Sequence, residues 1–182
     1  EYEKYGLPVL LSALEKSYLR ALWLKASRIK TDRKIFVRVI GYLIDAANAK
    51  AALRLKAVSM PEPEIDKYLI RPSYELSEAM LKAMVTAEDL ESAIHAIRIT
   101  TVGQVLSKAM DEIRREGVDA VERALDKGYL DLCKQMELLH QFSVAPILAY
   151  IAQKESEFRS LRKCLRLKAD GFKPEEIKKA IG

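Results

Sequence analysis

Apolar residues recur at steps of three and four along most of this 182-residue chain. Residues 3–26 place leucines and a tyrosine at this spacing, and residues 33–58 continue it with Phe36, Val39 and Ile40. This is the period of an α-helix with one buried face. Strong helix formers dominate the composition, and there are only seven glycines and six prolines. Because no stretch alternates strictly, as a half-buried strand would, the sequence predicts an all-α fold.

Capping and breaking residues mark the ends of the two longest predicted helices. Thr31 and Asp32 are suited to cap a helix over residues 33–58. A second long helix is predicted over residues 144–169, and Gly171 follows it where a helix C-terminus favours glycine.

The pentapeptide "LRLKA" occurs at residues 53–57 and again 112 positions later, at 165–169. Aligned without gaps, "LRLKAVSMPEPEIDKYL" and "LRLKADGFKPEEIKKAI" share eight identical residues. Each copy ends a helical run and leads through a turn into a short helix. We interpret this as two copies of one helical unit. The sequence therefore predicts one unit over residues 1–70 and a second over residues 71–182.

The repeated unit also carries polar side chains at matching positions. An acid is followed three residues later by a small polar residue, and then by the arginine and lysine of the pentapeptide. The first copy has Asp45, Asn48, Arg54 and Lys56, and the second has Glu157, Ser160, Arg166 and Lys168. Asp45 and Arg54 are nine residues apart, so they lie on opposite sides of a helix. We therefore expect a structural role: the acid and amide bond nearby backbone or helix ends, and the basic residues serve a helix C-terminus.

Basic residues concentrate in residues 16–38, within a chain of net charge +5. This stripe could be an interface with an acidic partner, a nucleic-acid surface or a solvated helix face. Its central members are Lys25, Arg28, Lys30, Arg33 and Lys34.

Catalytic and cofactor motifs are absent from the sequence. No phosphate-binding glycine motif occurs. The two histidines give only half of a di-iron pattern, because Glu137 precedes His140 by three residues and Ser92 precedes His95. We therefore expect no metal, no cofactor and no catalytic residues. No apolar run approaches the ~20 residues of a membrane-spanning helix, so we also expect no direct membrane insertion.

The pattern "D-x-x-N-x-x-x-x-L-R-x-K", the following "YLIRPSYELSEAML" and the C-terminal "KESEFRSLRKCLRLKADGFKPEEIKKAI" resemble the C (or d) subunit of archaeal and vacuolar-type rotary ATPases. The resemblance runs along the whole chain. That family is described as three related helical units, whereas two motif copies occur here, so we expect a form truncated at its N-terminus. Ser160 stands where the family more often has asparagine.

The resemblance implies a funnel of helices on the cytoplasmic face of the membrane, peripheral to it. Such a subunit links the shaft subunits of the central stalk to the membrane rotor ring and transmits torque. It has no catalytic site of its own and binds no nucleic acid. Two alternatives from other classes are a basic nucleic-acid-binding protein that uses the stripe, and an unrelated α-helical scaffold of the solenoid type.

Overall fold

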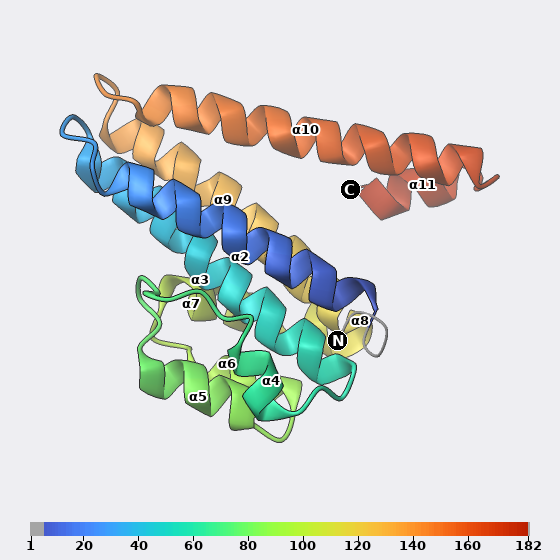
Figure 1. Ribbon diagram of the computed structural model, residues 1–182. Coiled ribbons are helices and arrows are strands. Elements are labelled where there is room, and N and C mark those ends of the chain that lie inside the picture. Colours follow the sequence, from blue (N-terminus) through green and yellow to red (C-terminus); the bar gives the residue numbers. More distant parts are fainter. Residues whose placement is uncertain (1–5, 182) are drawn as a thin grey trace. The chain divides into compact units, whose positions relative to one another are not determined.

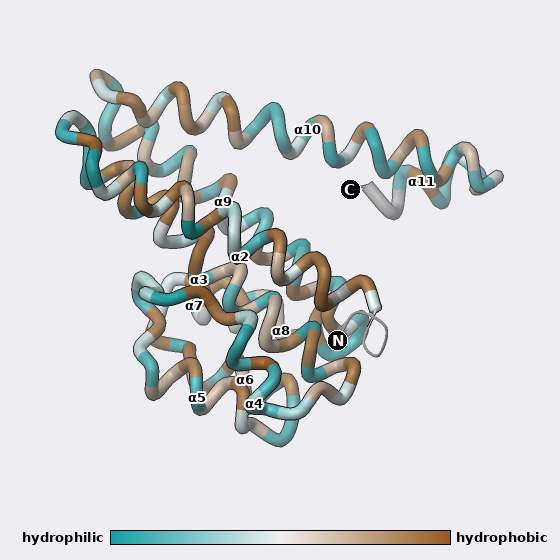
Figure 2. The backbone as a smooth tube through the Cα atoms, viewed as in Figure 1, coloured by the Kyte–Doolittle hydropathy of each residue, from teal (hydrophilic) through white to brown (hydrophobic). Residues whose placement is uncertain are grey.

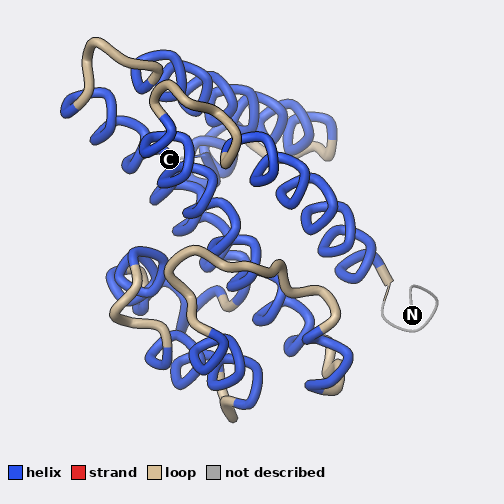
Figure 3. Tube along the Cα trace, turned by 60° about the vertical axis from the view of Figure 1, so that its left-hand side comes forward, coloured by secondary structure: helices blue, strands red, loops and turns tan. Residues whose placement is uncertain are grey.

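A computed structural model describes residues 6–181 of the chain. These residues form helices joined by turns and loops, with no strand among them, which confirms the predicted all-α fold (Figures 1 and 3). In chain order the helices are α2 (Leu7–Ala26), α3 (Arg33–Ala57), α4 (Glu62–Asp66), α5 (Glu78–Thr86), α6 (Leu90–Ala96), α7 (Thr101–Lys108), α8 (Met110–Glu116), α9 (Val118–Leu139), α10 (Ala145–Ala169) and α11 (Pro174–Ile181).

The chain folds into two compact units, Glu1–Tyr129 and Leu130–Gly182. Helix α9 runs from the first into the second. The division into repeats over residues 1–70 and 71–182 concerns duplication in the sequence, and it remains a prediction.

Helix α3 is the central element of the first unit. It forms an antiparallel hairpin with α2, and α4, α5 and α7 also pack against it (Figure 1). Ile44 and Ala47 of α3, Leu19 of α2 and Ile70 of the loop between α4 and α5 form a buried apolar cluster. The many alanines in the second half of α3 allow neighbouring segments to approach its backbone closely.

Side-chain caps fix the starts of the short helices. The hydroxyl of Ser77 accepts a hydrogen bond from the backbone N–H of Met80 at the start of α5. Asp89 caps α6 in the same way, as does Thr100 for α7. Asp32 occupies the N-cap position of α3 but makes no capping hydrogen bond, contrary to expectation. Its backbone is left-handed, with φ of 57°, instead of the extended geometry that side-chain capping normally uses.

The second unit contains the other copy of the repeated pentapeptide, in helix α10. Helices α3 and α10 are both 25 residues long, and each ends at the alanine of "LRLKA". Helix α4 begins at Glu62 and α11 begins at Pro174, which is 112 positions later. Both copies are therefore helical and are followed by a turn and a short helix, as predicted.

Candidate functional site

Asp45 lies at the centre of a polar cluster on the buried side of α3. The residue is only 1% exposed, and its carboxylate accepts two hydrogen bonds from a loop. The backbone N–H of Tyr74 donates to one oxygen over 2.8 Å, and that of Glu75 donates to the other over 2.6 Å. Burial raises the pKa of Asp45 from 3.8 to about 6, although the hydrogen bonds from the two N–H groups act to lower it.

Asn48 lies one turn further along α3 and binds the beginning of the same loop. Its amide nitrogen donates to the carbonyl oxygen of Ile70 over 3.1 Å, and its amide oxygen accepts from the N–H of Ile70 over 2.6 Å. The side chain thus pairs with one residue as a neighbouring strand would. Asp45 and Asn48 together hold the loop that connects α4 to α5 against the central helix.

Glu75 extends this cluster to the start of α7. Its carboxylate accepts hydrogen bonds from the backbone N–H and the hydroxyl of Thr101, over 2.6 and 3.0 Å. A negative charge is favourable at this helix N-terminus. Asp45 and Glu75 thereby link α3, the loop between α4 and α5, and the start of α7.

Basic residues on α3 bind helix α9. The Arg54 guanidinium donates to one carboxylate oxygen of Glu122 through Nε, at 3.0 Å, and Nη2, at 2.7 Å. One turn earlier, Lys50 binds Asp126 over 2.7 Å. The pairing order shows that α3 and α9 run antiparallel here. Arg54 therefore connects two helices. Its expected role at the C-terminus of its own helix remains a prediction.

Lys56 binds the C-terminus of a neighbouring helix, α5. Its ammonium donates to the carbonyl oxygen of Val85 over 2.9 Å and also to that of Ala87. These carbonyls lie at the end of α5, where backbone acceptors have no partner within the helix. The lysine therefore joins the end of α3 to the end of α5.

The equivalent residues on α10 have different surroundings. Glu157, Arg166 and Lys168 are exposed, and Ser160 is half-buried. Glu157 accepts hydrogen bonds from Lys154 and Gln153 of its own helix, and the bond from Lys154 is the larger cause of its lowered pKa. Each copy of the motif lies on a 25-residue helix, but the side chains of the two copies make different contacts.

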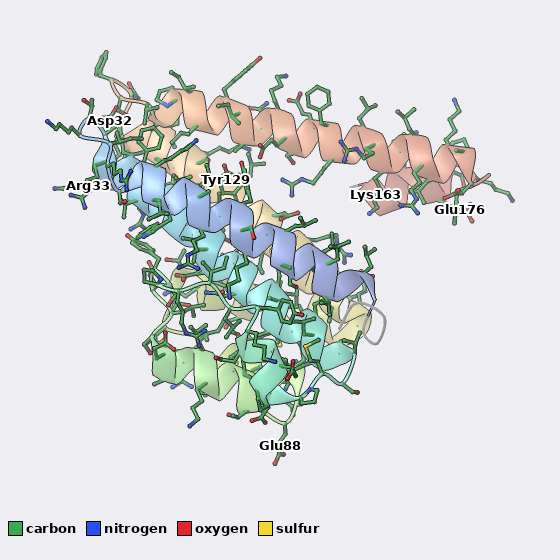
Figure 4. All side chains as sticks on the ribbon, in the orientation of Figure 1. Asp32, Arg33, Glu88, Tyr129, Lys163 and Glu176 are labelled. Carbon is green, nitrogen blue, oxygen red and sulfur yellow. The ribbon has the colours of Figure 1, made fainter. Side chains whose placement is uncertain are left out.

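The predicted basic stripe lies at the end of α2, in the following turn and at the start of α3. Figure 4 labels Asp32 and Arg33 at this turn. The structure brings the five predicted residues together on one exposed tip, formed by Lys25, Arg28, Lys30, Arg33 and Lys34. We call these five residues the basic tip.

The sequence interpretation missed Glu75, Glu122, Asp126 and Lys50. For Asp126 a signal was present, because "ALEKSYL" at residues 13–19 resembles "ALDKGYL" at residues 124–130, which aligns Asp126 with Glu15. Glu122 aligns with Leu11 and had no such signal. Nothing in the local pattern around Glu75 points to Thr101.

Within residues 6–181, no group of three or more histidine, cysteine, aspartate or glutamate side chains could hold a metal ion. None of the helices in that range has the length and hydropathy of a membrane-spanning segment. The clusters described above consist of side chains that hydrogen-bond to backbone groups and of ion pairs between helices.

Comparison with known proteins gives one family. The model of the ATP synthase (C/AC39) subunit family matches residues 1–180. The C subunit of the A-type ATP synthase of Methanocaldococcus jannaschii is 32% identical over 170 residues, which is 93% of this chain and 43% of the relative. The corresponding protein of Pyrococcus abyssi is 34% identical over 165 residues, covering 91% of this chain and 44% of that protein.

The C subunit of the Methanobrevibacter smithii enzyme is 31% identical over 182 residues, covering 97% of this chain and 47% of the relative. The chain thus spans less than half the length of these curated relatives. No solved structure matches. The chain belongs to the ATP synthase (C/AC39) subunit family.

Proposed function

We propose that this chain is a non-catalytic part of the central stalk of an A-type or vacuolar-type rotary ATPase. It links the rotating shaft to the membrane rotor ring and transmits torque for ATP-coupled ion transport. The carrying observation is the family match over residues 1–180, together with relatives that are C subunits of A-type ATP synthases. Its place is on the cytoplasmic face of the membrane, peripheral to the bilayer.

The internal construction of the first unit supports a mechanical role. A torque-bearing element needs segments that hold their positions under load. Asp45, Asn48 and Glu75 tie a long loop to two helices through paired hydrogen bonds that are buried at Asn48 and partly buried at the two acids. Buried polar groups of this kind are costly to separate, since each broken bond leaves an unsatisfied donor or acceptor.

The basic tip is the proposed contact with another rotor subunit. Its five exposed cations lie at the end of α2, in the turn that follows and at the start of α3. The partner we infer is an acidic surface on the shaft or ring. Charge of this kind steers association and sets its salt dependence more than its specificity.

Two measurements on a reconstituted motor test this function. Omitting the chain should abolish ATP-driven ion transport while ATP hydrolysis by the soluble head continues. Ion pumping that persists without the chain, or ATP hydrolysis by the isolated chain, would contradict the proposal.

The tip is tested by reversing Arg28, Lys30 and Arg33 to glutamate. Assembly should weaken, and its dependence on salt should become shallower. The matched control reverses Lys82, Arg98 and Lys108, three exposed cations elsewhere in the first unit. If both triple variants weakened assembly equally, the basic tip would not be a specific interface. That result would not contradict the proposed coupling role.

A further inference from the structure

Helix α9 is one continuous helix that belongs to both compact units. The division between the units falls within it, between Tyr129 and Leu130. Its first half contains the buried residues Val121 and Leu125, and its second half contains the buried Leu132. Figure 2 shows hydrophobic and hydrophilic residues interleaved along this helix. The backbone of α9 therefore connects the two units, and its stiffness limits how far one unit can turn relative to the other.

The part of α9 that precedes Gly128 is held to α3 by two ion pairs. Arg54 binds Glu122 over 2.7 Å, and Lys50 binds Asp126 over 2.7 Å. All four of these side chains belong to the first unit. The two pairs fix the direction of this part of the helix relative to α3, so a bend in α9 has to lie beyond them.

Gly128 lies two residues beyond the second ion pair and is buried. A Cβ at this position would lie 2.3 Å from the hydroxyl oxygen of Tyr42 and 2.9 Å from both methyl carbons of Val105, so the packing here requires glycine. Glycine weakens a helix, because its backbone loses more conformational freedom on becoming helical than that of alanine. Close packing thus requires a helix-weakening residue just before the division between the units.

The hydroxyl of Tyr42 makes the same place easier to bend. It donates a buried hydrogen bond to the carbonyl oxygen of Leu125 over 3.0 Å. In an α-helix this carbonyl also accepts from the N–H four residues later, which is that of Tyr129, labelled in Figure 4. A carbonyl oxygen can accept two hydrogen bonds, so the Leu125 carbonyl keeps a buried partner when its helical bond lengthens. Side chains inserted at helical hydrogen bonds are a known cause of helix bends.

We propose that α9 contains a hinge at residues 125–129, about which the second unit turns relative to the first. The ion pairs fix the segment before the hinge, and the glycine and the shared carbonyl make the hinge easier to bend than the helix on either side. Bending there leaves the contacts of Asp45, Asn48 and Glu75 intact, because these residues bind segments other than α9. The hinge goes beyond the proposed function and does not rest on it.

Hydrogen–deuterium exchange of the unmodified chain gives the first test. Exchange rates corrected for the intrinsic rate of each residue should be highest within α9 at residues 129–132, whose N–H groups bond to the carbonyls of residues 125–128. Residues 122–128 and 133–136, on either side, should exchange more slowly. Uniform protection along these residues would overturn the proposal.

Two matched variants isolate the contribution of the glycine. The control variant carries Tyr42→Phe and Val105→Ala, which remove the atoms nearest to the missing Cβ and leave Gly128 in place. The stiffened variant carries Gly128→Ala in addition, and circular dichroism verifies that both variants retain their helices. Residues 129–132 should exchange roughly fivefold more slowly in the stiffened variant than in the control, which is the effect of replacing glycine by alanine within a helix.

Spin-label distances measure the motion itself. Labels at Lys82→Cys in the first unit and Glu155→Cys in the second report on movement between the units, and labels at Lys82→Cys and Lys108→Cys give a reference within the first unit. All three positions are exposed. Every sample also carries Cys133→Ala and Cys164→Ser, so that the introduced thiols alone are labelled. By double electron–electron resonance, the distance distribution between the units should be wider than the reference, and narrower in the stiffened variant than in the control.

The outcomes separate a hinge in α9 from motion elsewhere. A distribution between the units as narrow as the reference would overturn the proposal, since the units would then not move. A distribution equally wide in the control and the stiffened variant would also overturn it and would place the motion outside α9, in the turn at residues 140–144. If the stiffened variant loses its helices, the exchange profile of the unmodified chain decides the question.

Discussion

Helices α3 and α10 have the same length and the same final pentapeptide, yet one is buried and the other is exposed. Leu53 is 2% exposed in α3, and its counterpart Leu165 is 59% exposed in α10. Asp45 binds a loop backbone, whereas Glu157 binds side chains of its own helix. The pentapeptide and its turn specify where a helix ends. The neighbouring segments specify what its side chains do.

The largest difference should come from truncating the paired leucines. Leu53→Ala should destabilise the first unit by about 2–5 kcal/mol, because it opens a cavity in a packed core. Leu165→Ala should cost less than about 1 kcal/mol, since that side chain is largely in water already. Urea denaturation followed by fluorescence of Trp23, the single tryptophan, reports on the first unit, and helicity reports on the whole chain. Equal costs for the two variants would contradict the contrast in burial.

Asn48 of α3 and its counterpart Ser160 of α10 should also differ in their effect on stability. Asn48→Ala should cost about 1–3 kcal/mol, because both polar groups of the Ile70 backbone lose their partner in a buried place. Ser160→Ala should change stability by less than about 0.5 kcal/mol. The tryptophan-detected urea midpoint is again the measurement, and an Asn48→Ala variant as stable as wild type would show that the loop is held by other contacts.

Stability should also depend on pH through Asp45. Its folded pKa is raised to about 6, above the unfolded value, so the folded state binds more protons between about pH 4 and 6. The contribution of Asp45 to stability is therefore greatest below about pH 4 and falls as pH rises to about 6, by up to about 1.4 kcal/mol per pH unit. Asp45→Asn should remove this slope.

The contribution of Glu157 to stability should change with pH in the opposite direction to that of Asp45. Its pKa is lowered, so its contribution is present above the unfolded value and is lost as pH falls. Glu157→Gln should leave the slope between about pH 4 and 6 unchanged. Urea denaturation at a series of pH values measures both variants, and a wild-type slope that survives Asp45→Asn would assign it to another group.

The smallest expected effect is at the lysines of the pentapeptide. Lys56→Met should destabilise the end of α5 by roughly 1 kcal/mol, since two terminal carbonyls lose a charged donor. Lys168→Met, at an exposed site, should produce no measurable change. Hydrogen exchange of residues 80–87 detects the loss locally, and unchanged exchange there would show that water replaces the ammonium without cost.

Much of the fold followed from local pattern. The predicted helices over 33–58 and 144–169 match α3 and α10 to within one residue, because proline, glycine and the apolar period act locally. The contacts of Arg54 and Lys56 did not follow. Their acceptors lie 68 and 29 residues away, and only the folded chain brings them together.

The duplication of α2 in α9 was missed for a different reason. The two helices match at an offset of 111 residues, whereas α3 and α10 match at 112, so the second copy has one additional residue between the two matching segments. An ungapped alignment extended upstream from "LRLKA" therefore lost the match. Recognising it requires "ALEKSYL" and "ALDKGYL" to be compared directly.

The most direct test of the contrast between the two copies is hydrogen–deuterium exchange of the full chain, with α3 and α10 compared in one dilute sample. We predict that residues 42–57 exchange far more slowly than residues 154–169. Equal protection of the two helices would contradict the conclusion that the first motif copy is buried and hydrogen-bonded to neighbouring segments whereas the second is exposed.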